Sequence, residues 1–95
     1  MFEAPLTKTR ARALLTRIIE RGGIIEYSTH ALDEMAKDGL SAQEVRKALA
    51  GGRVGKAYRR ETSWRHTVVA ARCTAVITFR VETHTVVVTA WRNNR

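Results

Sequence analysis

A chain of 95 residues, 44% of them hydrophobic and only one of them proline, has the size and composition of one small folded domain and not of a disordered segment. No apolar run approaches the roughly 18 residues that span a bilayer, and the charged segment TKTRARALLTRIIE lacks the uninterrupted apolar region of a signal peptide. We therefore expect a cytoplasmic protein without a membrane partner. The single Cys73 excludes an internal disulfide and leaves no partner for a cysteine-rich metal site.

The charge of the chain is strongly positive and unevenly distributed. Seventeen Lys and Arg against nine Asp and Glu give +8, and thirteen of the basic residues are Arg, whose planar guanidinium suits bidentate phosphate contacts. Residues 46–65 hold seven bases and one acid, Glu61. This balance indicates an anionic partner, nucleic acid or an acidic protein. We expect the region that binds this partner to begin after the helical part of the chain. The alternative is that the charge serves solubility alone.

The first half of the chain has helical patterns. Apolar residues recur with helical spacing over residues 7–21, and a Gly-Gly pair follows. Residues 24–27, IIEY, are predicted to be a short strand or an extended link. Residues 28–50 are predicted to hold two short helices separated by Gly39, the second of which opens with the capping box SAQE.

From residue 53 onward the apolar period changes to two, which is typical of strands rich in Val, Thr and Ile. We expect strands near residues 53–60, 64–72, 74–81 and 85–92. Short turns connect the last three, so an antiparallel meander is the simplest topology. The sequence thus predicts one α+β domain over residues 1–95, with three N-terminal helices packed on one face of a four-stranded antiparallel sheet spanning residues 53–92.

Alternation along the strands assigns the two faces of this sheet. With tight turns at 72–73 and 83–84, Arg65 is expected opposite Arg80, and Thr78 opposite both Thr67 and Thr89. The face toward the helices is expected to carry Val68, Ala70, Ala75, Ile77, Phe79, Val81, Val86, Val88 and Ala90. The other face is expected to carry Arg65, Thr67, Thr78, Arg80, Thr89 and Trp91.

Arginine, hydroxyl and indole side chains on one open face suit a sugar-phosphate chain. Arg neutralises phosphate, Thr bonds to phosphate or ribose oxygens, and Trp stacks on a base. The alternative is an ordinary solvated sheet face, on which Thr and Arg are common. The residues predicted to contact substrate are Tyr58, Thr78, Thr89, Trp91 and Arg92.

Metal-independent RNA cleavage needs a group that takes the 2′-hydroxyl proton, a group that protonates the leaving oxygen, and cations that stabilise the charged phosphorane. His30 is the candidate acid–base residue, because a helix N-terminus favours a neutral ring; the alternative is a histidine bonded to nearby backbone. His66 is expected to lie at the edge of the core with its hydrogen bonds satisfied, and His84 to be exposed in a turn. The predicted catalytic residues are His30, Arg65 and Arg80.

The sequence offers no metal-ligand spacing with a third partner nearby and no glycine-rich phosphate loop on a strand-to-helix turn. We therefore expect neither a metal nor another cofactor.

The stretch YSTHALDEMAKDGLSAQEVRKAL, followed by GGRV and by the closing VVVTAWR, resembles a family of small bacterial domains of unknown function. The shared pattern is an aromatic residue, a His-Ala pair that opens a helix, a Met four residues after that Ala, then Gly-Ile/Leu-Ser and a Val-rich last strand with Thr. The resemblance covers residues 26–92. This family is usually grouped with RelE/ParE-like toxins and the barnase–colicin–RelE fold of metal-independent ribonucleases, in which helices back a curved antiparallel sheet.

The resemblance implies an RNA-cleaving toxin held in check by a small acidic antitoxin bound over the sheet. By position, His30 matches the histidine of the family and Thr89 the threonine of its last strand. RelE-like relatives also include toxins that poison DNA gyrase and proteins with no known activity, so the fold alone does not establish cleavage.

The expected function is therefore that of a toxin-type, metal-independent endoribonuclease. The alternatives are a non-catalytic basic module that binds nucleic acid or protein, and a toxin directed at a protein such as gyrase. The expected partners are RNA and an acidic antitoxin, with a homo-oligomer as a further alternative.

Overall fold

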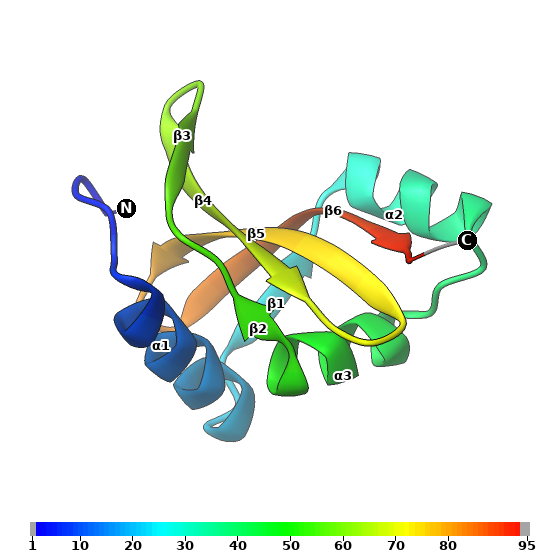
Figure 1. Ribbon diagram of the computed structural model, residues 1–95, viewed down its shortest axis with the longest axis horizontal. Helices are drawn as coiled ribbons and strands as arrows, with labels where there is room; N and C mark the ends of the chain where they lie inside the picture. The colour runs from blue at the N-terminus through cyan, green and yellow to red at the C-terminus, as the bar shows by residue number, and fades with distance from the viewer. Residues whose placement is uncertain (1, 94–95) are drawn as a thin grey trace.

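The computed structural model describes residues 2–93, which form three helices and a six-stranded mixed sheet in an α+β arrangement (Figure 1). In chain order the elements are α1 (Lys8–Glu20), β1 (Ile24–Tyr27), α2 (Thr29–Lys37), α3 (Ala42–Gly51), β2 (Arg53–Val54), β3 (Tyr58–Arg60), β4 (Ser63–Val69), β5 (Cys73–Val81) and β6 (His84–Arg92). None of the helices in this part of the chain has the length and apolar character needed to cross a membrane.

Each helix begins at a hydroxyl side chain that caps it. The side chain of Thr7 accepts a hydrogen bond from a backbone N–H of α1, and Ser28 does the same for α2. The predicted capping box at the start of α3 is confirmed: Ser41 Oγ accepts from the N–H of Glu44, whose carboxylate accepts from the N–H of Ser41. The three predicted helices and the short strand IIEY are all present.

The predicted four-stranded antiparallel sheet is wrong in two respects. First, β1 joins the sheet and runs parallel to β6, which gives the order β1-β6-β5-β4-β2. Second, the predicted strand at 53–60 is two strands, β2 and β3, both paired with β4. The strand is interrupted at Gly55: its N–H donates to the carbonyl of Thr67, but the next two residues are not paired with β4.

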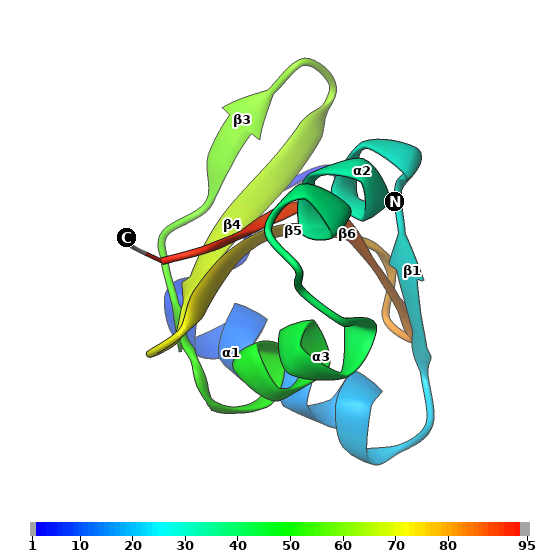
Figure 2. The same cartoon turned by 90° about the vertical axis from the view of Figure 1, so that its right-hand side faces the viewer.

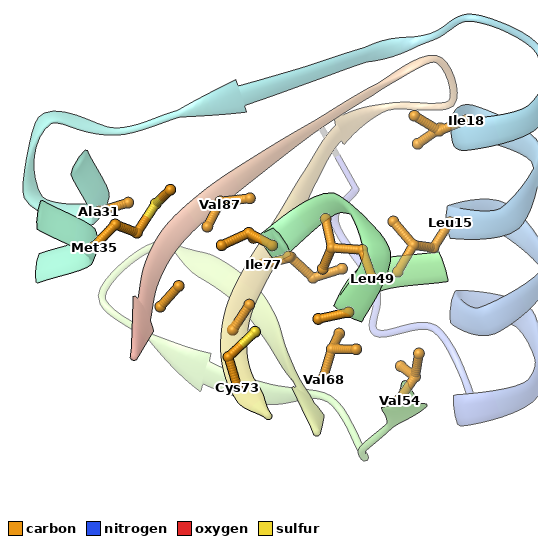
Figure 3. Close-up of a cluster of buried hydrophobic side chains, with 14 of the residues drawn as sticks. Leu15, Ile18, Ala31, Met35, Leu49, Val54, Val68, Cys73, Ile77 and Val87 are labelled. Atoms are coloured by element: carbon orange, nitrogen blue, oxygen red, sulfur yellow. The ribbon is translucent and has the colours of Figure 1, made fainter. Parts of the chain in front are cut away.

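The helices do not all pack on one face, which also corrects the prediction. In Figures 1 and 2, α1 and α3 lie on one side of the sheet, the β3–β4 hairpin rises on the other, and α2 lies at the β6 edge. Helix α2 begins where β1 ends and lies beside the second half of β6, tied there by a 2.9 Å bond from Ser28 Oγ to the carbonyl of Val88. Its Ala31 and Met35 reach into the shared core (Figure 3).

The core lies between the sheet and the helices α1 and α3. Leu15, Leu49 and Ile77, from α1, α3 and β5, are completely buried and face one another in Figure 3. Burying a side chain of this size contributes about 1.5–3 kcal/mol. These contacts fix the two sheet faces, so we call the face turned away from α1 and α3 the open face.

The predicted strand register is wrong by two residues between β4 and β5. Arg65 pairs with Thr78 and not with Arg80, and Thr67 pairs with Val76. A shift of two keeps every side chain on its predicted face, because strand alternation has a period of two.

Between β5 and β6 a bulge interrupts the alternation. Val76 pairs with Thr89 but Ile77 pairs with Val87, so Val88 is an extra residue of β6. Beyond this point the faces are exchanged: Val86 pairs with Thr78 on the open face, where it was not expected, and Thr85 takes a fully buried place. The predicted orientation of Val86 toward α1 and α3 is therefore wrong, although this residue is only 7% exposed. Val88, also predicted inward, is the half-buried extra residue, and Val81, predicted inward as well, is 48% exposed beside a second register irregularity between Phe79 and Val81.

Candidate functional site

A row of side chains crosses the open face from one edge of the sheet to the other. Directly paired residues put their side chains on the same face, and the observed pairs join Tyr58 to Arg65, Arg65 to Thr78, Thr78 to Val86, and Val86 to Glu26. This row takes one residue from each of five strands. It brings three of the predicted site residues together.

The two predicted catalytic arginines both lie next to Thr78, Arg65 within this row and Arg80 outside it. Arg65, on β4, pairs directly with Thr78. The half-buried side chain of Arg65 donates through Nε to Ser63 Oγ at 3.2 Å. Arg80 follows two residues later on β5, at a second register irregularity between Phe79 and Val81, and 54% of its side chain is exposed. The hydroxyl of Thr78 donates to the carbonyl of Trp64 at 2.8 Å, so only its lone pairs remain for a ligand.

The other predicted contacts on this face lie farther along it. Thr89 is half-buried opposite Val76, and Trp91 pairs with Thr74 and is 39% exposed. The pair containing Trp91 is four residues along β5 from Thr78, a distance of about 13 Å at ~3.3 Å per residue. The open face is therefore cationic at one end and aromatic at the other.

Arg92 is engaged in the fold rather than in this row. Its Nε and Nη2 donate to the carbonyls of Asp38 and Gly39 at 3.1 and 2.9 Å, and its Nη1 lies 3.5 Å from a Glu44 oxygen. Its partner on β5 is the buried Cys73. The guanidinium therefore ties the α2–α3 connection to the end of β6.

The structure does not bring His30 together with the two arginines. His30 is exposed in the first turn of α2 and makes no hydrogen bond or ion pair within residues 2–93. The bond between Ser28 and Val88 places the start of α2 level with Val88. Arg80 lies near the opposite end of β6, close to His84, which is four strand residues or about 13 Å from Val88.

His66 is a satisfied core histidine, as predicted. Its side chain is buried to 1% exposure, its Nδ1 lies 2.9 Å from the carbonyl of Gly55, and its ring meets Phe79 edge-on at 6.0 Å between centroids. Its ring is therefore held within the core, although His66 contributes to the wall of the pocket described below.

Sequence reasoning missed a cluster of Glu26, His84 and Arg80. His84 was expected in an exposed turn, but it is the first residue of β6, and 22% of its side chain is exposed. Its Nε2 lies 2.8 Å from Glu26 Oε1, and Arg80 Nε lies 3.6 Å from the same oxygen. The β5–β6 turn brings Arg80 close to His84, and the parallel pairing of β1 with β6 adds Glu26; no local pattern in the sequence predicts that pairing.

A pocket of about 190 Å³ adjoins this cluster. Its walls are largely apolar and come from the N-terminal segment, from β4 and from the turn end of β5 and β6, and Thr78 and Arg80 line it as well; the lining residues are Phe2, Ala4, Leu6, Ser63, Trp64, His66, Thr78, Phe79, Arg80 and Val86. The N-terminal segment is held there by a bond of 3.1 Å from Trp64 Nε1 to the carbonyl of Glu3.

The β3–β4 hairpin extends the positive surface beside this pocket. The hairpin stands away from the body of the sheet in Figure 1 and carries the exposed side chains of Arg59 and Arg60. The guanidinium of Arg59 lies 5.4 Å from the ring centre of Trp64, a cation–π contact. Among the described residues, no group of three or more His, Cys, Asp or Glu side chains is arranged to hold a metal ion.

These features define a small α+β domain with a basic, hydroxyl-bearing open sheet face and a carboxylate–histidine pair at one end of it. The chain belongs to the family described as "Domain of unknown function (DUF4258)", whose model matches residues 27–92. This confirms the predicted membership in a small family of unknown function. No curated protein matches the chain, and no solved structure does either.

Proposed function

We propose that the protein is a toxin-type, metal-independent endoribonuclease that binds RNA across its open face. The observation that carries the proposal is the placement of Arg65 and Arg80 next to Thr78, Arg65 as its pair on β4 and Arg80 two residues along β5, on the face turned away from α1 and α3. The net charge of +8 supports a polyanionic ligand.

The two arginines suit the electrostatic part of this reaction. Guanidinium groups bind phosphate oxygens bidentately, and their charge stabilises a phosphorane more strongly than it stabilises the ground state. Tyr58 borders Arg65, whereas Thr89 and Trp91 lie on the downstream part of the face, where nucleotides next to the cleaved bond would pass. The sequence-based candidate for proton transfer is His30.

The toxin part of the proposal concerns a protein partner. A small acidic antitoxin would complement the positive charge of the open face and block RNA by occupying it. This part rests on the sequence-based expectation that the family resembles RelE/ParE-like toxins and on the charge of the chain. A homo-oligomer that buries part of the same face is the further alternative.

Incubation of the purified protein with total RNA in the presence of a chelator tests the nuclease. We expect discrete cleavage products, loss of cleavage when Arg65→Gln and Arg80→Gln are combined, and retention of cleavage in Arg10→Gln, a matched control on the exposed surface of α1. His30→Ala in the same assay tests the sequence-based acid–base candidate.

The second candidate is a non-catalytic binding module. It is favoured by the finding that His30 stands apart from the arginines, because binding needs only the cations and the aromatic platform. RNA that stays intact but binds with an affinity falling steeply with salt would favour this module. Removing each arginine that contacts a phosphate would then make the negative slope of log K against log salt shallower by roughly 0.7 for single strands. Toxicity in cells without RNA binding would instead indicate a protein-directed toxin.

A further inference from the structure

Polar side chains from three strands meet where β5 turns into β6. Glu26 Oε1 contacts both His84 Nε2, at 2.8 Å, and Arg80 Nε, at 3.6 Å. From this geometry we infer that His84 is the catalytic base of the proposed ribonuclease, that Glu26 is its positioning residue, and that Arg80 holds the cleaved phosphate beside it. The inference rests on the proposed function and moves proton transfer from His30 to His84.

The contact with Glu26 fixes the tautomer of the His84 ring. A carboxylate only accepts hydrogen bonds, so Nε2 must carry a proton at 2.8 Å from Glu26 Oε1. In the neutral ring Nδ1 is then the acceptor, and Nδ1 makes no hydrogen bond within residues 2–93. An imidazole held by a carboxylate through one nitrogen is ready to take a proton on the other.

Arg80 places a phosphate close to this base. Its Nε faces Glu26, while its two terminal nitrogens make no hydrogen bond in the described part of the chain. These terminal nitrogens form the edge of the guanidinium that binds two phosphate oxygens at once. Arg65, across β4 from Thr78, supplies a second cation on the same face.

The pocket of about 190 Å³ can hold the base of a nucleotide next to the bound phosphate. Arg80 and Thr78 line it together with Trp64, Phe79 and Val86. Planar, largely apolar surroundings next to a phosphate-binding arginine suit a nucleobase, which stacks on aromatic and guanidinium planes. The substrate class is therefore single-stranded RNA with an unstacked base at the cleaved step.

The reaction proceeds with atoms and charge in balance. Nδ1 of His84 takes the proton of the ribose 2′-hydroxyl, the 2′-oxygen forms a bond to phosphorus, and the bond from phosphorus to the 5′-oxygen breaks. Arg80 and Arg65 stabilise the added negative charge in the transition state. The leaving oxygen takes a proton from water, and the imidazolium returns its own to the hydroxide so formed. The products are a 2′,3′-cyclic phosphate and a 5′-hydroxyl end.

Neither of the other histidines has these properties. His66 is buried to 1% exposure and its Nδ1 faces a backbone carbonyl. His30 is exposed but contacts neither a carboxylate nor an arginine among residues 2–93, and the start of its helix is about 13 Å along β6 from His84.

Single-turnover cleavage of a defined RNA in chelator tests the inference. His84→Gln should lower the rate constant by about 10²–10⁴ at saturating protein and leave RNA affinity, measured by fluorescence anisotropy, unchanged. Glu26→Gln should lower the rate without changing affinity, whereas Glu20→Gln on α1 should change neither. The ¹⁵N shifts of the His84 ring add a readout that a structural role would not move: they should show the Nε2–H tautomer in the native protein and a mixture of both tautomers in Glu26→Gln, because the amide can either accept from Nε2–H or donate to Nε2.

The outcomes separate this inference from the proposed function. Full activity of His84→Gln, with loss of activity in His30→Gln, overturns the inference and leaves the nuclease standing. Weaker binding by His84→Gln without a lower rate at saturation also overturns it, since His84 would then only bind RNA. RNA left intact by the unsubstituted protein overturns the proposed function and this inference with it.

Discussion

The end of α3 provides a stability test in two adjacent glycines. Gly51 and Gly52 look alike in the sequence, as a pair that ends a helix. In the structure a Cβ added at Gly51 would meet nothing within 4 Å, whereas one added at Gly52 would lie 2.6 Å from the carbonyl oxygen of Ala48 and 3.0 Å from that of Val69. We therefore predict opposite effects of the two alanine substitutions.

The magnitudes follow from these surroundings. Alanine at Gly51, the last residue of α3, gains helix propensity of up to ~1 kcal/mol. Alanine at Gly52 must displace the backbone of α3 or of β4, and overpacking of this kind costs about 1–3 kcal/mol. The displacement also strains the 2.7 Å bonds from Gly52 N–H to Ala48 O and from Arg12 Nη1 to Gly52 O, each worth about 0.5–1.5 kcal/mol or more. We expect a total cost near 3 kcal/mol, within the sum of these ranges.

Thermal and urea unfolding followed by circular dichroism measure the difference. For a domain of this size 1 kcal/mol shifts Tm by roughly 4–8 °C, so Gly52→Ala should melt roughly 12–24 °C below the native protein and Gly51→Ala at or slightly above it. Equal Tm values for the two variants would refute the close approach of α3 to β4 at Gly52. A changed urea m-value would instead indicate a change in compactness of the folded or unfolded state.

Three further predictions concern single side chains. Arg12 donates two 2.7 Å bonds to carbonyls at the end of α3, so Arg12→Met should lower the free energy of unfolding by about 2–4 kcal/mol, whereas the exposed Arg10→Met should change it by less than ~0.5 kcal/mol; equal losses would contradict the capping role. The backbone N–H of Ser41 holds the pKa of Glu44 below its usual value. The contribution of the Glu44 carboxylate to folding stability is therefore present above its unfolded pKa and is lost as the pH falls through the lower folded pKa. Glu44→Gln should lower Tm near neutral pH but not in strong acid. Burial raises the pKa of the Cys73 thiol, which is 2% exposed, so a thiol reagent should label it only as fast as the protein unfolds, and rapid labelling of the native protein would contradict its burial.

Local features of the structure could be predicted from the sequence. The apolar spacing of α1, the Ser41–Glu44 capping box and the change of period at residue 53 depend on neighbours within one turn or one strand. Such neighbours determine helix caps and side-chain alternation directly. The three helices, the strand-rich second half and the outward orientation of Arg65 and Thr78 were predicted for this reason.

The register of β6 could not be predicted in the same way. Period two holds on each side of Val88, but that residue is an extra one, and a single insertion reverses every side chain beyond it. Nothing in the run HTVVVTAWR marks the position of the bulge, because Val is compatible with either face. The prediction therefore placed Val86 on the face toward the helices, whereas it is buried on the other face, and it missed the burial of Thr85.

The same reversal determines which histidine can act on the open face. Counted back from the inward-facing Ala90 with unbroken alternation, His84 would point toward the helices. With the bulge, it lies on the side of Val86 and Thr78. The parallel strand β1 then adds Glu26 to that side, 58 residues away in the chain. The carboxylate–histidine pair therefore depends on the bulge and on β1 together. Deleting Val88 should restore unbroken alternation, separate His84 from Glu26 and remove the tautomer signature of the ring, even in a variant that still folds.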